Sequence, residues 1–242
     1  VLDALQAARL GDIAARFPEY PYPSLLAALS VSVDALPADV RERYLSLAIF
    51  PDDVGLPEGV LETYWQPATA VQVRASIATL VDRSLLSRDH AGRLMLHDLQ
   101  LAYLRGRVSD AQSLHATFLA RHNPAGRLWA EVPDNGYLYD FLVHHLLRAD
   151  RLTEALTLFA DTAWRDARYR ASELRHDGYL FDLELLWSNV AEPTARRQID
   201  AEAPGVALAL CTRLALIQTT IHSLESNVPA ALIVRAAETR AW

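Results

Sequence analysis

Two side chains capable of chemistry, His97 and Asp98, stand where a strand-like alternation of residues gives way to a helical pattern. An imidazole at such a junction can pack in a core, bind a metal, act as a general base or contact a phosphate group. Asp98 directly precedes a predicted helix over 99–105, so its carboxylate is placed to accept backbone N–H groups and cap that helix. We therefore expect a structural role for Asp98, and the role of His97 decides what this region does.

Four further histidines offer weaker chemistry. His115 and His122 are seven residues apart on one face of a predicted helix, and His144 and His145 are adjacent on another. No HExxH pattern and no partner cysteine supports a metal site, and no Ser/His/Asp arrangement can be defended from its spacing. We predict no metal site and no catalytic residues, and we expect these four histidines to be packed or exposed.

The composition excludes functions that depend on lysine or paired cysteines. All 23 basic residues among the 242 are arginine, and the formal net charge is −7. Without lysine the chain has neither a P-loop GxxxxGK[ST] nor a Schiff-base nucleophile, so we expect no nucleotide hydrolysis and no other enzymatic activity from this chain alone. A single cysteine, Cys211, excludes an internal disulfide and a cysteine-based zinc site, which fits a cytoplasmic protein.

We expect no membrane-spanning segment and no signal peptide in this sequence. The longest apolar stretch, 206–217, is interrupted by Thr212 and Arg213 and is shorter than the roughly 20 residues needed to span a bilayer. The first residues include Asp3 and lack the basic start of a signal peptide. Because the sequence opens within a helical pattern and without methionine, we expect it to be a piece of a longer protein.

The elements that must position His97 form a run of helices followed by a hairpin. Hydrophobic spacing, proline and capping residues predict helices near 1–17, 25–36, 40–50, 58–65 and 70–83. Two short apolar runs, 85–87 and 94–96, flank a polar turn that ends in Gly92, which is typical of a β-hairpin. Helices followed by a two-stranded wing predict a winged-helix domain over 19–107.

The rest of the chain, 108–242, predicts an all-helical domain. Its candidate helices are 111–122, 137–150, 151–163, 178–189 and 207–224, with prolines at 124, 133, 193, 204 and 229 as breakers. The predicted fold class is therefore mainly α: a winged-helix domain with a small β-hairpin, followed by an all-α domain. Residues 1–18 are interpreted as the tail of a preceding helical domain and a linker.

Three phrases of the sequence occur together in the order known from one family. They are Phe50-Pro51-Asp52-Asp53, the LVDRSLL phrase at 80–86 and the LHDLQLAYL phrase at 96–104. With them the chain resembles the winged-helix part of NB-ARC-type STAND ATPases, the family of apoptosome scaffolds and plant resistance proteins. The family usually has methionine before the His-Asp pair, where this sequence has Leu96, a volume-conserving change. The following helices resemble the helical domain of apoptosome-type members, and this resemblance fades after about Trp187.

The resemblance implies a role in nucleotide sensing. It places His97 against the β-phosphate of ADP held by an upstream nucleotide-binding domain, which locks a closed, inactive state. It also implies a second, minor phosphate contact at Ser84, although a structural role is the stronger expectation there. The implied cofactors are ADP or ATP with Mg²⁺ in the intact protein and none in this chain. The implied partners are that upstream domain, a downstream sensor domain and further copies of the same protein, which assemble on activation.

Two alternative functions remain at this point. A winged helix can bind DNA, but residues 19–107 hold 11 acidic and 8 arginine side chains, a poor surface for the phosphate contacts that dominate DNA affinity. We accordingly expect neither nucleic-acid nor membrane binding. The helical part can instead be a repeat adaptor that binds proteins without any ATPase, since 151–156 resembles a tetratricopeptide phrase. One such phrase does not make an array, which needs at least about three stacked units.

Overall fold

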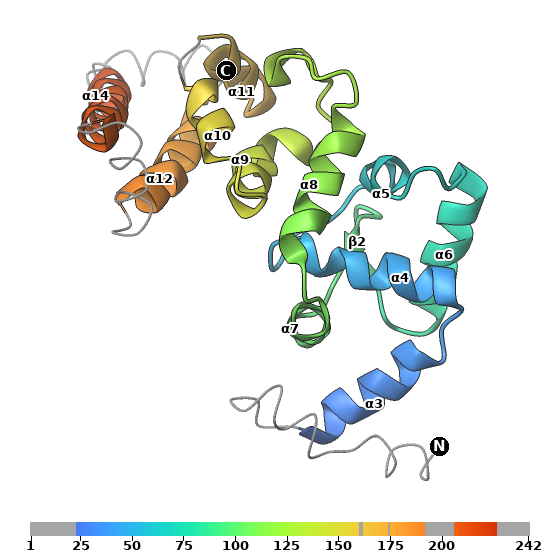
Figure 1. Cartoon of the computed structure of the whole chain (residues 1–242). Helices are drawn as coiled ribbons and strands as arrows, with labels where there is room; N and C mark the ends of the chain where they lie inside the picture. The colour runs from blue at the N-terminus through green and yellow to red at the C-terminus, as the bar shows by residue number, and fades with distance from the viewer. Residues whose placement is uncertain (1–22, 160–161, 174, 192–205, 227–242) are drawn as a thin grey trace, which may run out of the picture. The chain divides into compact units, whose positions relative to one another are not determined.

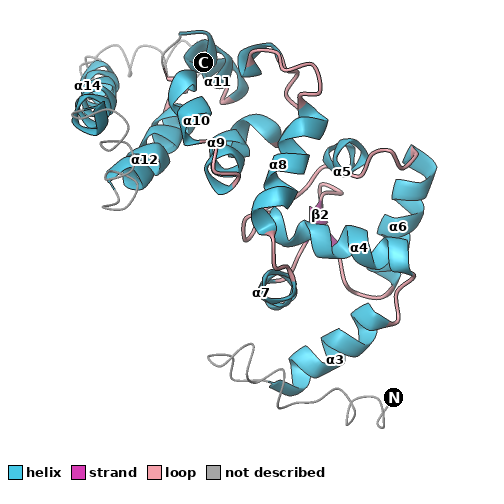
Figure 2. Cartoon of the chain, in the orientation of Figure 1, coloured by secondary structure: helices cyan, strands magenta, loops and turns pink. Residues whose placement is uncertain are grey.

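The computed structural model describes residues 23–159, 162–173, 175–191 and 206–226 (Figure 1). Figure 2 shows that this part of the chain is mainly helical. Its described sheet is two-stranded and antiparallel, and together these features confirm the predicted class. The helix predicted over 1–17 lies outside the described residues. The chain divides into two compact units, Val1–Arg151 and Leu152–Trp242, so the first unit extends past the predicted winged-helix domain. The domain boundary after 107 and the winged-helix assignment stay predictions.

The first unit contains the helices before and after the hairpin. Its described helices are α3 (Pro23–Asp34), α4 (Ala38–Ser46), α5 (Glu58–Tyr64), α6 (Ala70–Asp82), α7 (Asp98–Arg107), α8 (Ala111–His122) and α9 (Leu138–Arg148). Two short 3₁₀ helices, η1 (Leu47–Ile49) and η2 (Trp129–Glu131), lie between them. The helix predicted over 40–50 is thus α4 followed by η1, because the chain tightens at Leu47 before Phe50-Pro51 turns to an extended conformation.

The hairpin lies between α6 and α7, as predicted. Strand β1 (Ser87–Arg88) pairs with β2 (Leu94–Met95), with Arg88 opposite Leu94. The Asp89 carboxylate holds the turn because its Oδ1 accepts the backbone N–H groups of Ala91 and Arg93, each at 2.8 Å. Gly92 supplies the positive φ of 78° that the turn requires. This short hairpin leads directly into His97.

An aromatic core joins Phe50, which follows η1, and α5 to α8 and α9. Phe50 is buried and meets Tyr64, Phe118, Tyr137 and His145 edge to face, with ring centroids 5.3–6.2 Å apart. Edge-to-face pairs of this kind contribute about 0.5–1.5 kcal/mol each beyond the area they bury. The phrase at 50–53 therefore has a packing role, since its phenylalanine lies at the centre of the unit.

The second unit is built from α10 (Leu152–Leu158), α11 (Thr162–Ala171), α12 (Asp177–Ala191) and α14 (Val206–Ser226). The prediction of one helix over 151–163 is wrong, because α10 ends at Leu158 and α11 begins at Thr162. The face that α11 buries includes a charged residue, Arg168, whose guanidinium pairs at 3.0 Å with the buried carboxylate of Asp182 on α12. In the part of the chain that the structure describes, no helix is long and apolar enough to span a membrane.

Candidate functional site

His97 lies at the surface, at the end of the hairpin and the start of α7. It is the N-cap residue of that helix, with extended backbone angles, and its Nδ1 accepts the backbone N–H of Leu99 at 3.4 Å. The prediction that Asp98 caps the helix is wrong, because α7 begins one residue earlier than expected and Asp98 is its first residue. The Asp98 carboxylate instead lies in the first turn, where negative charge interacts favourably with the helix dipole.

Gln100 ties His97 to the second candidate residue, Ser84. The Gln100 Oε1 accepts the backbone N–H of His97 at 2.9 Å, which completes a capping box. On its other side, the Gln100 Nε2 donates to the backbone carbonyl of Ser84 at 2.7 Å. Two residues 13 positions apart in the sequence are therefore held in place by one amide side chain.

Ser84 stands at the turn that follows α6. Its φ of 57° lies in the left-handed region, which is uncommon for a residue other than glycine, and its backbone N–H donates to Val81 at 2.9 Å. The Ser84 side chain is exposed. Among the residues that the structure describes, none hydrogen-bonds the Ser84 hydroxyl or the His97 Nε2.

The capping contact decides which nitrogen of His97 can donate. A neutral imidazole carries one N–H, so a ring whose Nδ1 accepts from Leu99 carries its proton on Nε2. That Nε2–H belongs to an exposed side chain and can be offered to an oxygen outside this unit. The site is thus suited to contacting an oxyanion, not to abstracting a proton.

His115, His144 and His145 form a cluster between α8 and α9. The His115 Nδ1 and the His145 Nδ1 are 2.8 Å apart, and the His145 Nε2 lies 2.8 Å from the Tyr137 hydroxyl. The Phe118 ring stacks on His145 at a centroid distance of 4.2 Å. With both ring nitrogens engaged and no exposed surface, His145 is part of the core.

Burial keeps this cluster uncharged. Desolvation, assisted by the charges of neighbouring groups, lowers the pKa of His115 to about 3 and that of His144 to about 4. The pKa of His145 lies well below its ordinary value for the same main reason. Arg105 and Arg148 contribute to the shifts of His115 and His144, since a positive charge opposes a second one nearby. Within the described ranges, no group of three potential metal ligands occurs. We therefore interpret the histidine cluster as part of the packed core.

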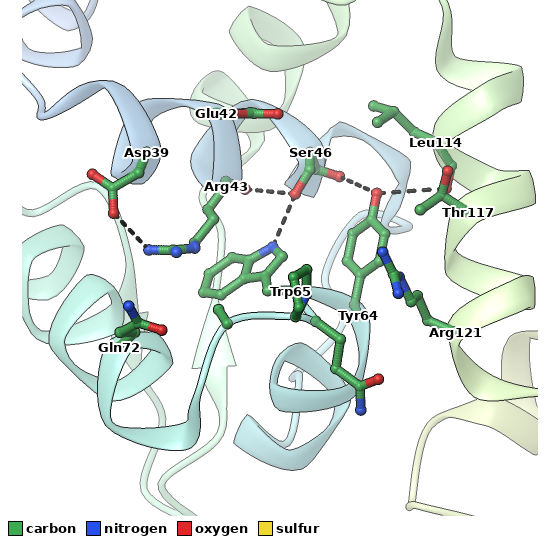
Figure 3. Close-up of a pocket in the computed structure, with 13 residues that line it drawn as sticks. Asp39, Glu42, Arg43, Ser46, Tyr64, Trp65, Gln72, Leu114, Thr117 and Arg121 are labelled. Carbon is green, nitrogen blue, oxygen red and sulfur yellow. Dashed lines mark hydrogen bonds and ion pairs between the residues drawn. The ribbon is translucent and has the colours of Figure 1, made fainter. Parts of the chain in front are cut away.

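A cavity of about 630 Å³ lies elsewhere, among α4, the end of α5, α6 and α8 (Figure 3). The polar side chains that line the cavity are largely hydrogen-bonded to neighbouring residues. The Trp65 indole N–H donates to the Ser46 hydroxyl at 2.9 Å. Arg43 donates to the Asp39 carboxylate and to the Ser76 hydroxyl. No arrangement of nucleophile and base lines it. The cavity therefore offers a shaped surface without reactive groups, and His97 remains the stronger candidate.

The sequence contains the spacing of a capping box that includes Gln100, but the histidine at its N-cap position makes the motif hard to recognise. A capping box places Gln or Glu three residues after the N-cap, and Gln100 stands three residues after His97. The N-cap position normally holds serine, threonine, aspartate or asparagine, so Asp98 attracted the capping role instead. The contact from Gln100 to Ser84 depends on tertiary structure and had no sequence signal.

Comparison with known proteins supports the resemblance drawn from the three phrases. No protein-family model matches the chain. The apoptotic protease-activating factor 1 of Homo sapiens is 32% identical over 156 residues, which cover 62% of this chain and 12% of the human protein. The Mus musculus protein of the same name is 30% identical over 156 residues, and the Danio rerio protein 28% over 167 residues. The chain thus spans about an eighth of the length of these relatives, and the similarity supports a relationship to NB-ARC-type STAND proteins.

Proposed function

We propose that this chain is a regulatory region of a STAND-type signalling ATPase. In this proposal it couples the nucleotide state of a preceding nucleotide-binding domain to conformational switching and oligomerisation. The observation that carries the proposal is the exposed His97, whose Nδ1 is engaged in a helix cap and whose Nε2 has no hydrogen-bond partner within the described residues. The name of the relatives, a factor that activates a protease, suits a signalling role.

The chemistry assigned to His97 is a hydrogen bond to the β-phosphate of ADP. An imidazole N–H donated to a phosphate oxygen is charge-assisted and contributes about 1.5–3 kcal/mol. Moving a two-state switch from 1:99 to 99:1 requires about 5.5 kcal/mol of differential binding. The contact therefore supplies only part of the free energy that favours the closed state, and contacts between the domains supply the remainder. In this proposal the Ser84 hydroxyl adds a second, smaller contact.

The nucleotide chemistry itself belongs to another part of the protein in this proposal. The chain contains no lysine for a phosphate-binding loop, so ADP or ATP with Mg²⁺ is bound upstream and this region acts without catalysing a reaction. A sensor domain follows the helical part, and the activated protein assembles with further copies of itself in the cytoplasm.

Neither alternative gains support from the geometry. The described helix that would enter a DNA groove, α6, presents Arg74 and Arg83, but the Arg83 guanidinium donates to the backbone carbonyl of Ala35 at 3.3 Å. The acidic surroundings remain unfavourable for DNA phosphates. An adaptor function of the second unit would not explain why His97 is exposed in the first unit.

The proposal is tested on the intact protein by measuring its molecular mass with light scattering in ADP and in ATP. We expect single copies with ADP and larger assemblies with ATP and the activating signal. His97→Ala should shift the balance toward assemblies in ADP, because the closed state loses a contact. His90→Ala is a matched control, since His90 is another exposed histidine, in the hairpin turn. An identical mass in both nucleotides, unaffected by His97→Ala, would contradict the proposed function.

A further inference from the structure

Two helices of the first unit, α6 and α7, begin with the same motif but use it differently. In α6 the Gln72 Oε1 accepts the backbone N–H of Thr69 at 2.9 Å, while the Thr69 hydroxyl accepts the backbone N–H of Gln72 at 3.4 Å. This is the usual capping box, with threonine at the N-cap. The Gln72 side chain hydrogen-bonds only to Thr69, at its own helix end, among the described residues. The capping box of α6 therefore stabilises the N-terminus of its own helix.

The α7 box has features that helix capping does not require. Its N-cap residue is His97, which accepts the Leu99 N–H through its imidazole Nδ1 and is not among the preferred capping residues. Its glutamine, Gln100, makes a contact that Gln72 lacks, the 2.7 Å hydrogen bond to the Ser84 carbonyl. That contact joins the start of α7 to the turn after α6, across the whole hairpin. A cap alone needs neither an imidazole nor this second bond.

We infer that Gln100 is a positioning residue that holds the His97 imidazole and the Ser84 hydroxyl as one preorganised pair for phosphate. The inference rests on the proposed function and deepens it. The amide is suited to this role because Oε1 accepts from the His97 backbone while Nε2 donates to the Ser84 backbone, so both hydrogen-bonding directions are used. Both partners are backbone atoms, so the side chains of His97 and Ser84 are left to contact a ligand.

Two conformational consequences support the role. Ser84 is held at a φ of 57°, a conformation that a serine adopts at a cost, and the bond from Gln100 to its carbonyl restrains it there. The bond from the His97 backbone N–H to Gln100 restrains the backbone of His97, from which the contact between Nδ1 and the Leu99 N–H orients the ring. A donor that is already oriented before ligand binding loses less conformational entropy when the ligand arrives. The two contacts are therefore expected to strengthen or weaken together.

The test is a set of ADP dissociation rates measured on the intact protein with a fluorescent ADP analogue. In the wild-type background, Gln100→Ala should speed dissociation by at least about threefold, within the range of couplings between residues that act as a unit. In a His97→Ala, Ser84→Gly background, Gln100→Ala should have no further effect, because nothing remains for it to position. Ser84→Gly suits the control background because glycine accepts the positive φ without strain.

Two further variants separate positioning from capping. Gln72→Ala removes the matching glutamine of α6 and should leave the ADP rate unchanged. Gln100→Glu keeps an acceptor for the His97 backbone but loses the donor to Ser84, so its ADP dissociation should be faster than in wild type and slower than in Gln100→Ala. The inference is overturned if Gln100→Glu has the wild-type rate, or if Gln100→Ala has the same effect in both backgrounds. If His97→Ala and Ser84→Gly leave the rate unchanged, the proposed function itself fails.

Discussion

His97 and His145 are the same residue type in opposite environments within one unit. His97 is exposed and uses one ring nitrogen in a long contact with the backbone of its own helix. His145 has no exposed surface and uses both ring nitrogens, one toward His115 and the other toward Tyr137. An imidazole with two engaged nitrogens cannot offer an N–H to an external ligand. The comparison shows how the two roles differ. A histidine whose two ring nitrogens are both hydrogen-bonded is structural, whereas a histidine with one unengaged nitrogen is a candidate contact residue.

The largest difference between the two histidines is expected in stability. His145→Ala should lower the free energy of unfolding by about 2–5 kcal/mol, because it leaves a cavity and removes the partner of the buried Tyr137 hydroxyl and of His115. Urea unfolding of the chain, followed by circular dichroism, measures this loss. A change below about 1 kcal/mol would show that the cluster is not part of the core.

The second largest effect is expected from acidification, which should lower the free energy of unfolding through the buried histidine cluster. The pKa of His115 falls from an ordinary 6.5 to about 3 and that of His144 to about 4, so the native state binds fewer protons than the unfolded chain. The stability that these neutral rings contribute is complete above pH 6.5 and is lost as pH falls below it. At pH 5 each such histidine costs about 2 kcal/mol. Unfolding free energies measured between pH 7 and pH 5 test this.

The matched variant for the pH experiment is His115→Gln, which cannot take up a proton in this range. It should reduce the slope of stability against pH, even if it also lowers stability at pH 7. An unchanged slope would place the acid sensitivity in other groups.

A smaller loss is expected at the ordinary capping box. Thr69→Ala should lower the free energy of unfolding by about 0.5–2 kcal/mol, because the backbone N–H of Gln72 loses its partner at the start of α6. Urea unfolding of the chain measures the change. A loss near zero would indicate that the N-terminus of α6 frays without cost.

The smallest stability effect should come from His97→Ala, at about 0.5 kcal/mol or less. Histidine is not among the preferred capping residues, its side chain is exposed, and the bond from its backbone N–H to Gln100 does not depend on its side chain. The difference from Thr69→Ala under identical unfolding conditions is the informative quantity. A loss as large as that of His145→Ala would make His97 a structural residue and remove the basis of its sensor role.

Much of the fold around His97 could be predicted from the sequence. The hairpin follows from apolar runs on either side of a polar turn with Gly92, and the observed strands, 87–88 and 94–95, lie within or next to the predicted ones. Helix α6 starts at Ala70 as predicted, and its buried face includes Val73, Ile77 and Leu80. These features are local, and the periodicity of apolar residues specifies them directly.

The remaining features depend on tertiary contacts. Helix α11 was missed because Arg168 interrupts its apolar face, and only the carboxylate of Asp182 on another helix makes that arginine a buried residue. The cap at His97 was assigned to Asp98 because intrinsic preference favours aspartate. The link between Gln100 and Ser84 closes across the hairpin, beyond the reach of any short sequence pattern. The sensor roles of His97 and Ser84 stay predictions.

The rate at which ADP leaves the intact protein tests the central claim most directly. The claim is that His97 contacts the nucleotide and is dispensable for the fold. Wild-type protein, His97→Ala and the exposed control His90→Ala are loaded with a fluorescent ADP analogue and chased with unlabelled ADP. Losing a contact of about 1.5–3 kcal/mol should speed dissociation about 10- to 150-fold in His97→Ala and leave His90→Ala unchanged. Equal rates for all three proteins would contradict the account.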